Sequence, residues 1–489
     1  MNLNFQFIAY FPLIFVFLQS FMFYFTENNF IPASVIVNSF CIIFLFLIKP
    51  KFFFEKIITL YKYTPFKYLV ILYLWIFISG LLCLVLQYIT LFKFVWAIIV
   101  GFVLRLVFIY FYSSILIPKI FNIKTLMKVF VFAYFTIFII GFIEFVGVFY
   151  GIEIINNFIH FISNIRKEET SIIIDNISNI PRIRSVCMEP GTYGRFIAIQ
   201  MPLIYQLVTC KYKIFKSSIL NKITKITLIP MLWISLLLTQ SPIYLVICTI
   251  VTILFFYKHL IHCLLKNAKK ILIFAFVIIT FICIFIFASN ISFKTTFINR
   301  IIETVGLIKS FSLNNLIIVE PSLATRVVNN LNQFLMFLKH PITGIGLFNN
   351  GPMMIKQFET SGIPLTPEMT RVLIDATSTM TYTTNALYSL LHQTGLFGAV
   401  LYILFAIKSI KFVQKLIKYF SRIEKIFLTG FMKSVITLFS ISIIYNQDVN
   451  DQFLFFMFGL CSATYFYYKK KINIDITYTR KNTMENNAK

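Results

Sequence analysis

The sequence is poor in charge, and in acidic residues above all. Only 13% of its 489 residues are charged, and 44 Lys and Arg stand against 18 Asp and Glu. Soluble globular chains carry roughly 25% charged residues, so this composition excludes an ordinary soluble domain. With 59% hydrophobic residues and a mean hydropathy of +0.84, the chain has lipid as its main solvent.

Clustered metal ligands are also missing. The eight cysteines are scattered, and no CxxC pattern or Cys/His cluster exists, so neither a metal site nor a disulfide framework is indicated. We expect no metal and no cofactor. The net charge of +26 would suit nucleic acid, but a general bias toward Phe, Ile, Asn and Lys accounts for part of it. We therefore expect no nucleic-acid partner.

What the chain has instead is long apolar runs. A helix needs about 20 mostly apolar residues to cross a bilayer, because backbone polar groups in lipid must be satisfied within the helix. The first residues, MNLNFQF, have no basic region and no small-residue cleavage site, which indicates a retained span. The two short runs that meet at Ser241 and Pro242 are also compatible with one re-entrant hairpin. The pattern predicts an all-α polytopic membrane protein with about twelve spans, near residues 5–25, 30–48, 67–88, 94–117, 126–150, 195–210, 226–240, 242–257, 271–289, 386–407, 426–445 and 452–468.

Every second connection between these apolar runs is rich in Lys and Arg. With the N-terminus inside, the inner connections are all basic, with few acids: 49–66, 118–125, 211–225, 258–270, 408–425 and the tail from 469. The opposite connections carry most of the acids, including Glu27, Glu168, Glu169, Asp175, Glu189, Asp448 and Asp451. The excess of Lys and Arg on one side places both termini in the cytoplasm. We expect an integral protein of the cytoplasmic membrane, with one transmembrane domain over 1–468 and a basic cytoplasmic tail over 469–489.

This orientation leaves two long outer segments, 151–194 and 290–385. Connections of such length are usually functional or disordered. Within the second, the run RVVNNLNQFLMFLKH from Arg326 repeats apolar residues at helical spacing, and Pro341 follows it. The pattern predicts a short amphipathic helix that lies against the outer ends of the spans.

The stretch RSVCMEPGTYGR, residues 184–195, gathers charge and glycine where the chain re-enters the membrane. Together with Arg182, its arginines Arg184 and Arg195 could bind phosphate oxygens in bidentate fashion, and Glu189 could accept the proton of an attacking hydroxyl. Gly191 and Gly194 would allow close backbone approach. The alternative is a cap at the membrane edge, with arginines that reach toward lipid headgroups.

This stretch resembles a signature of the O-antigen polymerase and ligase superfamily. Arg184, Glu189, Pro190 and Gly194 are similar to the family's R-x-x-G-x-x-x-E/x-P-x-x-x-G pattern. A second resemblance, to the family's series of Arg, P-x-x-G-x-G, (H)N-x-Y-L and E-x-G-x-x-G, involves Arg326, Pro341, Gly344, Gly346, Asn385, Tyr388, Gly395 and Gly398. A third, over 238–242 (LTQSP), is similar to an L-T-x-S-R hairpin. Together these matches cover roughly residues 180–405 of the chain.

The sequence departs from the family at several positions. No glycine occurs in 185–188, Pro242 replaces an arginine, and Gln393 replaces a glutamate. The ligase branch often has a histidine before the Asn, where this chain has Thr384. That difference favours a polymerase over a ligase.

The resemblance implies a metal-independent glycosyltransferase of surface-polysaccharide synthesis, in a capsule or lipopolysaccharide pathway. A growing glycan on polyprenyl diphosphate would be transferred to the terminal hydroxyl of a new lipid-linked repeat unit at the outer face. The residues expected to bind the diphosphate are Arg182, Arg184, Arg195 and Arg326, Glu189 is the candidate base, and the candidate substrate-cleft residues are Arg371, Asn385, Tyr388 and His392. Expected partners are the lipid-linked oligosaccharide, the bilayer, a chain-length regulator and a flippase.

Other interpretations stay open. A ligase would move the finished glycan to another acceptor. A polysaccharide flippase or other secondary transporter predicts short outer loops and broken helices at the bilayer midplane. A metal-dependent lipid-sugar glycosyltransferase would need a D-x-D-like site in an early outer loop, where only Glu27 occurs.

Some single residues also have two interpretations. His392 is either bonded within the helix bundle or a proton-transfer group. Gly344 and Gly346 form either a phosphate-binding nest of amides or a plain turn. Arg105 and Glu144 fall within apolar runs, where charge is expensive, and suggest an intramembrane ion pair.

Overall fold

A computed structural model describes residues 22–26, 29–120, 123–155, 157, 183, 185, 190–209, 215–239, 241–266, 321–347, 353, 357–358, 360–363, 385–444 and 452–487. Over these residues the chain is predominantly helical, with one small antiparallel sheet. Its contacts divide it into two units, residues 1–129 with 321–489 and residues 130–320.

The first unit opens with the sheet and a bent pair of helices. Strands β1 (Met22–Thr26) and β2 (Asn29–Pro32) pair antiparallel and lead into α2 (Ala33–Ile48). Helix α3 (Pro50–Tyr63) follows after a bend of 114°. Pro50 explains the break, because proline disfavours helix at the residue before it and fits the first position of a new helix. The connection predicted over 49–66 is therefore largely helical.

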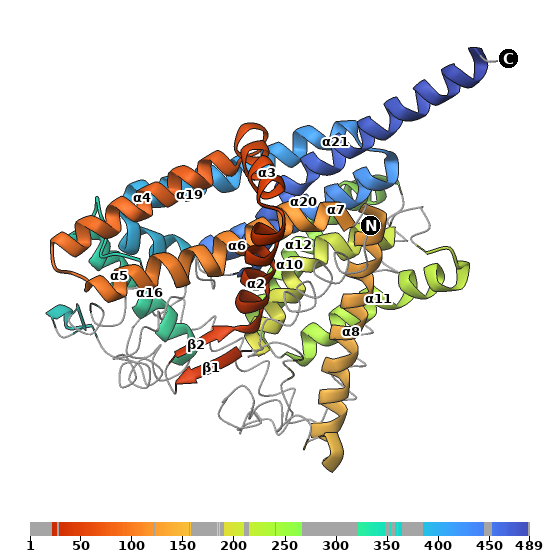
Figure 1. Ribbon diagram of the computed structural model, residues 1–489. Helices are drawn as coiled ribbons and strands as arrows, with labels where there is room; N and C mark the ends of the chain where they lie inside the picture. Colours follow the sequence, from red (N-terminus) through yellow and green to blue (C-terminus); the bar gives the residue numbers. More distant parts are fainter. Residues whose placement is uncertain are drawn as a thin grey trace. The chain divides into compact units, whose positions relative to one another are not determined.

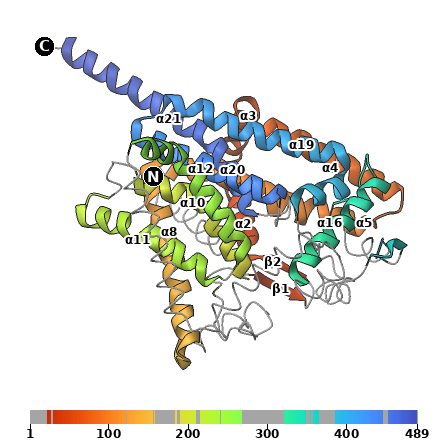
Figure 2. The same ribbon diagram turned by 180° about the vertical axis from the view of Figure 1, so that it is seen from behind.

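Four longer helices, α4 (Phe66–Val85), α19 (Ala386–Leu416), α20 (Arg422–Ile444) and α21 (Gln452–Asn487), form much of this unit. Helix α4 lies alongside α19, as both views show (Figures 1 and 2). Helix α19 also packs on α20, on α21 and on the shorter α16 (Pro321–Lys339). Helix α21 runs on past Lys469, so the predicted tail begins as a helix rather than a loose segment.

A continuous helical run with two π-helical stretches completes the unit. It consists of α5 (Leu91–Trp96), η1 (Ala97–Val107), α6 (Phe108–Phe111), η2 (Tyr112–Leu116) and α7 (Ile117–Ile120), and a 3₁₀ turn, η3 (Ile417–Tyr419), follows α19. Helix α21 packs on α6 and η2 with very close backbone approach at Gly459. There the buried Tyr110 hydroxyl bonds to Ser462 at 2.5 Å. Small residues at such contacts let helices approach in lipid, where no hydrophobic effect drives them together.

The second unit is a group of helices around α10. It contains most of α8 (Ile123–Phe149), together with α10 (Pro190–Thr209), α11 (Ser218–Leu238) and α12 (Pro242–Lys266). Helix α10 packs on both α11 and α12. The Tyr205 hydroxyl of α10 links these helices, since it accepts from Trp233 Nε1 at 3.1 Å and bonds to Thr252 Oγ1 at 2.9 Å.

The described helices confirm a membrane protein with several spans. Six of them are long and apolar enough to cross a bilayer, or seven if α2 and α3 form one broken span. These six overlap the predicted spans 67–88, 94–117, 126–150, 226–240, 386–407 and 426–445. Large apolar side chains such as Leu74, Val85 and Phe132 are exposed on their outer faces, as lipid contact requires.

The total of about twelve spans stays a prediction. Helices α10, α12 and α21 cover the predicted spans 195–210, 242–257 and 452–468. The predicted span 271–289 lies outside the described residues, as does most of 5–25, whose last residues belong to β1. The two helices at Ser241 are separate in the structure, with α12 beginning at Pro242.

Gly459→Ala should destabilise the first unit. An added Cβ would lie 1.8 Å from Ser113 Oγ and 2.6 Å from the Tyr110 carbonyl oxygen, and overpacking of this kind costs about 1–3 kcal/mol. Gly191→Ala is the matched control, because a Cβ there meets nothing within 4 Å. Thermal unfolding of the detergent-purified variants should show a lower Tm for Gly459→Ala alone, and equal Tm values would contradict the close contact.

Candidate functional site

The structure describes five of the predicted site residues. Arg195 lies in the second unit, and Arg326, Asn385, Tyr388 and His392 lie in the first. The other four, Arg182, Arg184, Glu189 and Arg371, lie outside the described residues. The predicted site is therefore described below as two clusters, one in each unit.

In the second unit, the stretch that contains Arg184 is anchored on both sides of that residue. Ile183 donates its backbone N–H to the Leu238 carbonyl at the end of α11, at 3.1 Å. Ser185 donates its N–H to Glu144 Oε2 at 2.7 Å and its hydroxyl to the Ile137 carbonyl at 2.6 Å. Ser185 has a φ of +52°, which is uncommon for a residue other than glycine, and these bonds stabilise it.

Glu144 is the functional candidate that sequence reasoning assigned to a different role. The sequence marked it as an expensive charge within an apolar run and suggested an ion pair with Arg105. The structure buries its side chain on α8 and gives it the Ser185 amide as a partner. Hydrogen bonds to an ionised carboxylate are strong, so Glu144 positions the backbone next to Arg184. The position of Glu144 in an apolar run was the signal in the sequence that it has a special role. The sequence spacing did not show that its partner is the amide of Ser185.

The start of α10 brings the two glycines of the stretch into different surroundings. A Cβ at Gly194 would lie 3.0 Å from the ring of Tyr244 on α12, whereas a Cβ at Gly191 would meet open space. Gly194 is thus in close contact with α12, whereas Gly191 faces open space. Arg195 follows Gly194 and is half-buried.

The second cluster, in the first unit, centres on a break in α19 at Gly395. This residue has φ +69° and ψ −177°, a conformation reserved for glycine, and the helix is kinked there. A Cβ would lie 1.9 Å from the Ile342 carbonyl oxygen, so the backbone of residues 341–346 lies directly against the kink. We call residues 341–346 and 392–396 together the glycine junction.

The glycine junction satisfies the backbone groups that the kink releases. Leu396 N–H, which in a regular helix would bond to the His392 carbonyl, instead donates to Pro341 O at 2.9 Å. The carbonyls of His392 and Gln393 accept from Ile345 N–H at 2.8 Å and Gly346 N–H at 3.1 Å. In lipid each of these groups would otherwise be unsatisfied at a cost of several kcal/mol.

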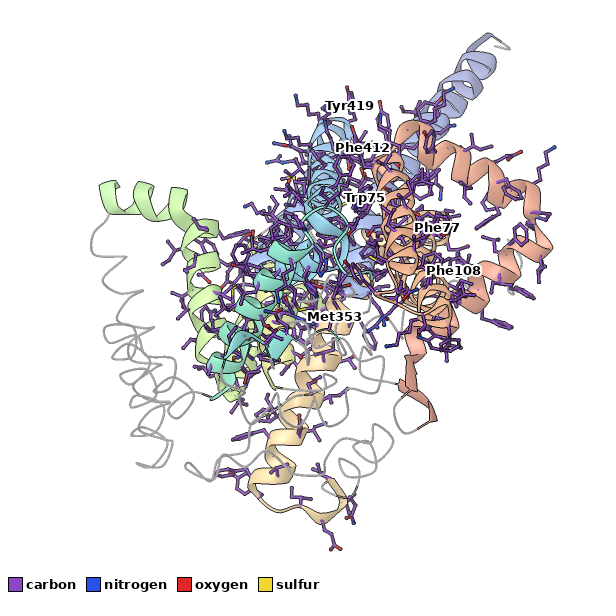
Figure 3. All side chains as sticks on the ribbon, turned by 90° about the vertical axis from the view of Figure 1, so that its left-hand side faces the viewer. Trp75, Phe77, Phe108, Met353, Phe412 and Tyr419 are labelled. Atoms are coloured by element: carbon purple, nitrogen blue, oxygen red, sulfur yellow. The ribbon has the colours of Figure 1, made fainter. Side chains whose placement is uncertain are left out.

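Helix α4 completes the glycine junction from the other side. Trp75, which is labelled in Figure 3, donates its indole N–H to the Thr394 carbonyl at 2.8 Å. Ser79 donates its hydroxyl to the carbonyl of Thr343. Gly344 must be glycine, because its φ is +66° and a Cβ would lie 2.4 Å from the backbone of Gln393. Two glycine patterns far apart in the sequence, 341–346 and 395–398, are thus one packed element.

The amides of this loop decide between the two interpretations of Gly344 and Gly346. Gly344 N–H donates to the His340 carbonyl at 3.0 Å, and Gly346 N–H donates to Gln393. Amides that are bonded to backbone carbonyls cannot form a phosphate nest. The plain-turn interpretation is therefore confirmed for this loop.

Asn385 and Tyr388 lie where α19 begins. Asn385 caps the helix, since its Oδ1 accepts the amides of Leu387 at 2.9 Å and Tyr388 at 3.3 Å. Its Nδ2 donates to the Ile443 carbonyl at the end of α20, at 2.6 Å. The Tyr388 ring packs edge-on against Phe334 of α16, with centroids 6.1 Å apart, which brings this end of α19 to the helix that carries Arg326.

His392 and His340 both make contacts inside the first unit. His392 is fully buried and donates Nδ1–H to the Tyr388 carbonyl at 2.6 Å, which agrees with bonding inside the bundle. His340 packs edge-on against Tyr88 at 4.8 Å. Partial burial, and then the neighbouring Lys339, lower the pKa of His340 below its ordinary value.

No protein-family model matches the chain, and no curated protein matches it. Among the described residues, no group of three or more His, Cys, Asp and Glu side chains could hold a metal ion.

Gly395→Ala should destabilise the protein more than Gly362→Ala. Both glycines have positive φ, at +69° and +65°, but only Gly395 faces a backbone carbonyl, whereas Gly362 has open space around it. The positive φ alone costs about 1–3 kcal/mol for a residue other than glycine, and overpacking adds about 1–3 kcal/mol at Gly395. Equal losses of Tm in the two purified variants would contradict the contact between the loop and the kink.

Glu144→Ala should destabilise the second unit, because it leaves the buried Ser185 N–H without its acceptor. Such a loss costs about 1–3 kcal/mol. Glu144→Gln is the matched control, since its amide oxygen can still accept the bond and its Tm should fall less. If both variants lose the same stability, the charge of Glu144 rather than this hydrogen bond is what matters.

Proposed function

We propose that this chain is a polysaccharide polymerase of the cytoplasmic membrane, a glycosyltransferase that works without a metal ion. The observation that carries the proposal is the glycine junction. Four residues of the second motif set, Pro341, Gly344, Gly346 and Gly395, meet at one kink of α19, which α4 also contacts through Trp75. Helix α16, which carries Arg326, packs on α19. Each short pattern alone could resemble the family by chance. Because the patterns pack together in one structural element, a chance resemblance is less credible.

In the proposed reaction the acceptor's terminal hydroxyl attacks the anomeric carbon of the donor's reducing-end sugar. The bond from that carbon to the diphosphate oxygen breaks, and polyprenyl diphosphate leaves. Glu189 accepts the hydroxyl proton, and Arg182, Arg184, Arg195 and Arg326 hold the diphosphate oxygens. Guanidinium groups suit this role because they stay charged and bind phosphate in bidentate fashion. They can stabilise the negative charge that develops on the leaving group.

The orientation proposed from the basic connections places this chemistry at the outer face of the membrane, with both termini in the cytoplasm. The lipid-linked repeat unit would reach that face through a flippase, and a chain-length regulator would limit the product. The ligase interpretation differs only in the acceptor, and the absence of a histidine at position 384 supports the polymerase.

The test compares surface polysaccharide from cells that carry the intact protein, Arg184→Ala or Glu189→Ala. Loss of a general base typically lowers a rate by about 10²–10⁴-fold, so the long ladder on a sizing gel should collapse to a single repeat unit. Arg371→Ala is a comparison from the candidate cleft, and we expect it to shorten the ladder less.

Membrane levels of all variants must be equal, as measured by immunoblot. Full-length glycan that accumulates on the lipid carrier would indicate a ligase. Unchanged ladders in both variants would refute the site and leave residues 184–195 as a membrane-edge cap.

A further inference from the structure

Helix α16 exposes a row of large apolar side chains along one face. Its apolar side chains Leu331, Phe334 and Leu338 are exposed by 41%, 38% and 56%. The sequence predicted an amphipathic helix here, and α16 packs on α19. The apolar row faces away from the buried side of the helix, which suits a surface that meets lipid.

The opposite face of α16 is buried, and it carries four polar side chains beside the apolar Ala324, Val328 and Met336. Thr325, Asn329, Asn332 and Gln333 all have 0% of their surface exposed. Their spacing of four, seven and eight residues places them on one face of a helix. We call these four residues the amide row.

In the part of the chain that the structure describes, one member of the amide row has no hydrogen-bond partner. Gln333 Nε2 donates to Asn329 Oδ1 at 3.3 Å, but neither Oδ1 nor Nδ2 of Asn332 has a partner among the described residues, although both atoms are buried. An unsatisfied buried amide costs free energy, typically about as much as a lost hydrogen bond or more, and is rare in native proteins. The Nδ2 donor and the Oδ1 acceptor of Asn332 are therefore available to hydrogen-bond a ligand.

The chemistry of the row selects the class of ligand. An amide both donates and accepts, and a hydroxyl group is the partner that can do both in return. The row contains no charged side chain, and the two cations of α16 are Arg326, one residue beyond Thr325, and Lys339, whose Nζ donates to Gln357 Oε1 at 2.6 Å. A neutral, hydroxyl-rich ligand therefore fits better than an ion.

The outer face of α16 constrains the ligand further. Because Leu331, Phe334 and Leu338 are exposed on the other side of the same helix, an amphiphile can place an apolar tail in the surrounding lipid while its head group lies at the amide row.

We propose that the amide row of α16 binds the sugar hydroxyls of a glycolipid, with Asn332 as the residue that the ligand satisfies. This inference deepens the proposed function, on which it rests for the identity of the natural glycolipid. It assigns binding of the sugar to Asn332 of α16, less than two helical turns from Arg326, to which the proposed function assigns the diphosphate.

The experiment is photolabelling of the full-length protein in lipid nanodiscs. The probes are alkyl glucosides and alkyl galactosides that carry a diazirine beside the sugar, and the comparison probe has the same chain and diazirine with a phosphocholine head. Trypsin cleaves after Arg326 and Lys339, so the label on the amide row is read by mass spectrometry on the peptide 327–339. Labelling by at least one sugar probe should exceed that by phosphocholine.

Asn332→Leu should lower sugar-dependent labelling about 3- to 10-fold, the equivalent of one net hydrogen bond. Asn330→Leu is the matched control, because the same substitution on the same helix falls outside the amide row. Asn332→Leu should also keep or raise Tm, since it removes an unsatisfied buried amide. A residue needed only for packing would lower Tm on substitution.

Several results would overturn the proposal. One is equal labelling of the intact protein and of Asn332→Leu by the sugar probes. Another is labelling by the phosphocholine probe that is as strong as labelling by the sugar probes. A third is labelling by the sugar probes that excess methyl glucoside or methyl galactoside does not reduce. The last test needs no variant, so it holds even if Asn332→Leu does not fold. Labelling requires no glycan transfer, so it can succeed when the polysaccharide ladders of Arg184→Ala and Glu189→Ala are unchanged, and the two proposals fail separately.

Discussion

The need to satisfy every backbone polar group in lipid is the constraint on which the rest of the first unit depends. Gly395 breaks α19 and releases carbonyl and amide groups near the start of a candidate span. Buried backbone groups must find partners within the protein. The loop 341–346 and the side chain of Trp75 supply these partners, so the kink, the loop and α4 pack as one element.

That constraint also explains why two glycine patterns that are far apart in the sequence, 341–346 and 395–398, are both needed. Gly344 and Gly395 are required because each packs its backbone against the other segment with a positive φ. Their role is to hold the loop that follows α16 against α19. The loop joins the end of α16, the helix that carries Arg326 and the amide row, to α19. The motif glycines therefore have a structural role, which is to let these backbone segments pack closely.

In the second unit the same constraint acts through side chains. Glu144 and the carbonyls of Ile137 and Leu238 accept the polar groups of Ile183 and Ser185, residues that flank Arg184. A buried carboxylate is expensive in an apolar helix. Its retention in α8 is explained by the anchoring of the stretch that precedes α10.

The sequence by itself determined that lipid is the solvent, where several spans lie, and that a helix ends before Pro341 and is followed by a glycine-containing loop. These features follow from local composition, because apolar length, proline and glycine act through the residues nearest to them. It could not determine which face of α16 is buried, that the Gly344 and Gly346 amides bond to α19, or that Glu144 accepts from Ser185. Each of these depends on a partner far away in the chain, and only packing in three dimensions chooses that partner. Helix α16 shows the difference most clearly: its apolar spacing predicted a helix correctly, but the direction of its apolar face depends on whether lipid or protein surrounds it.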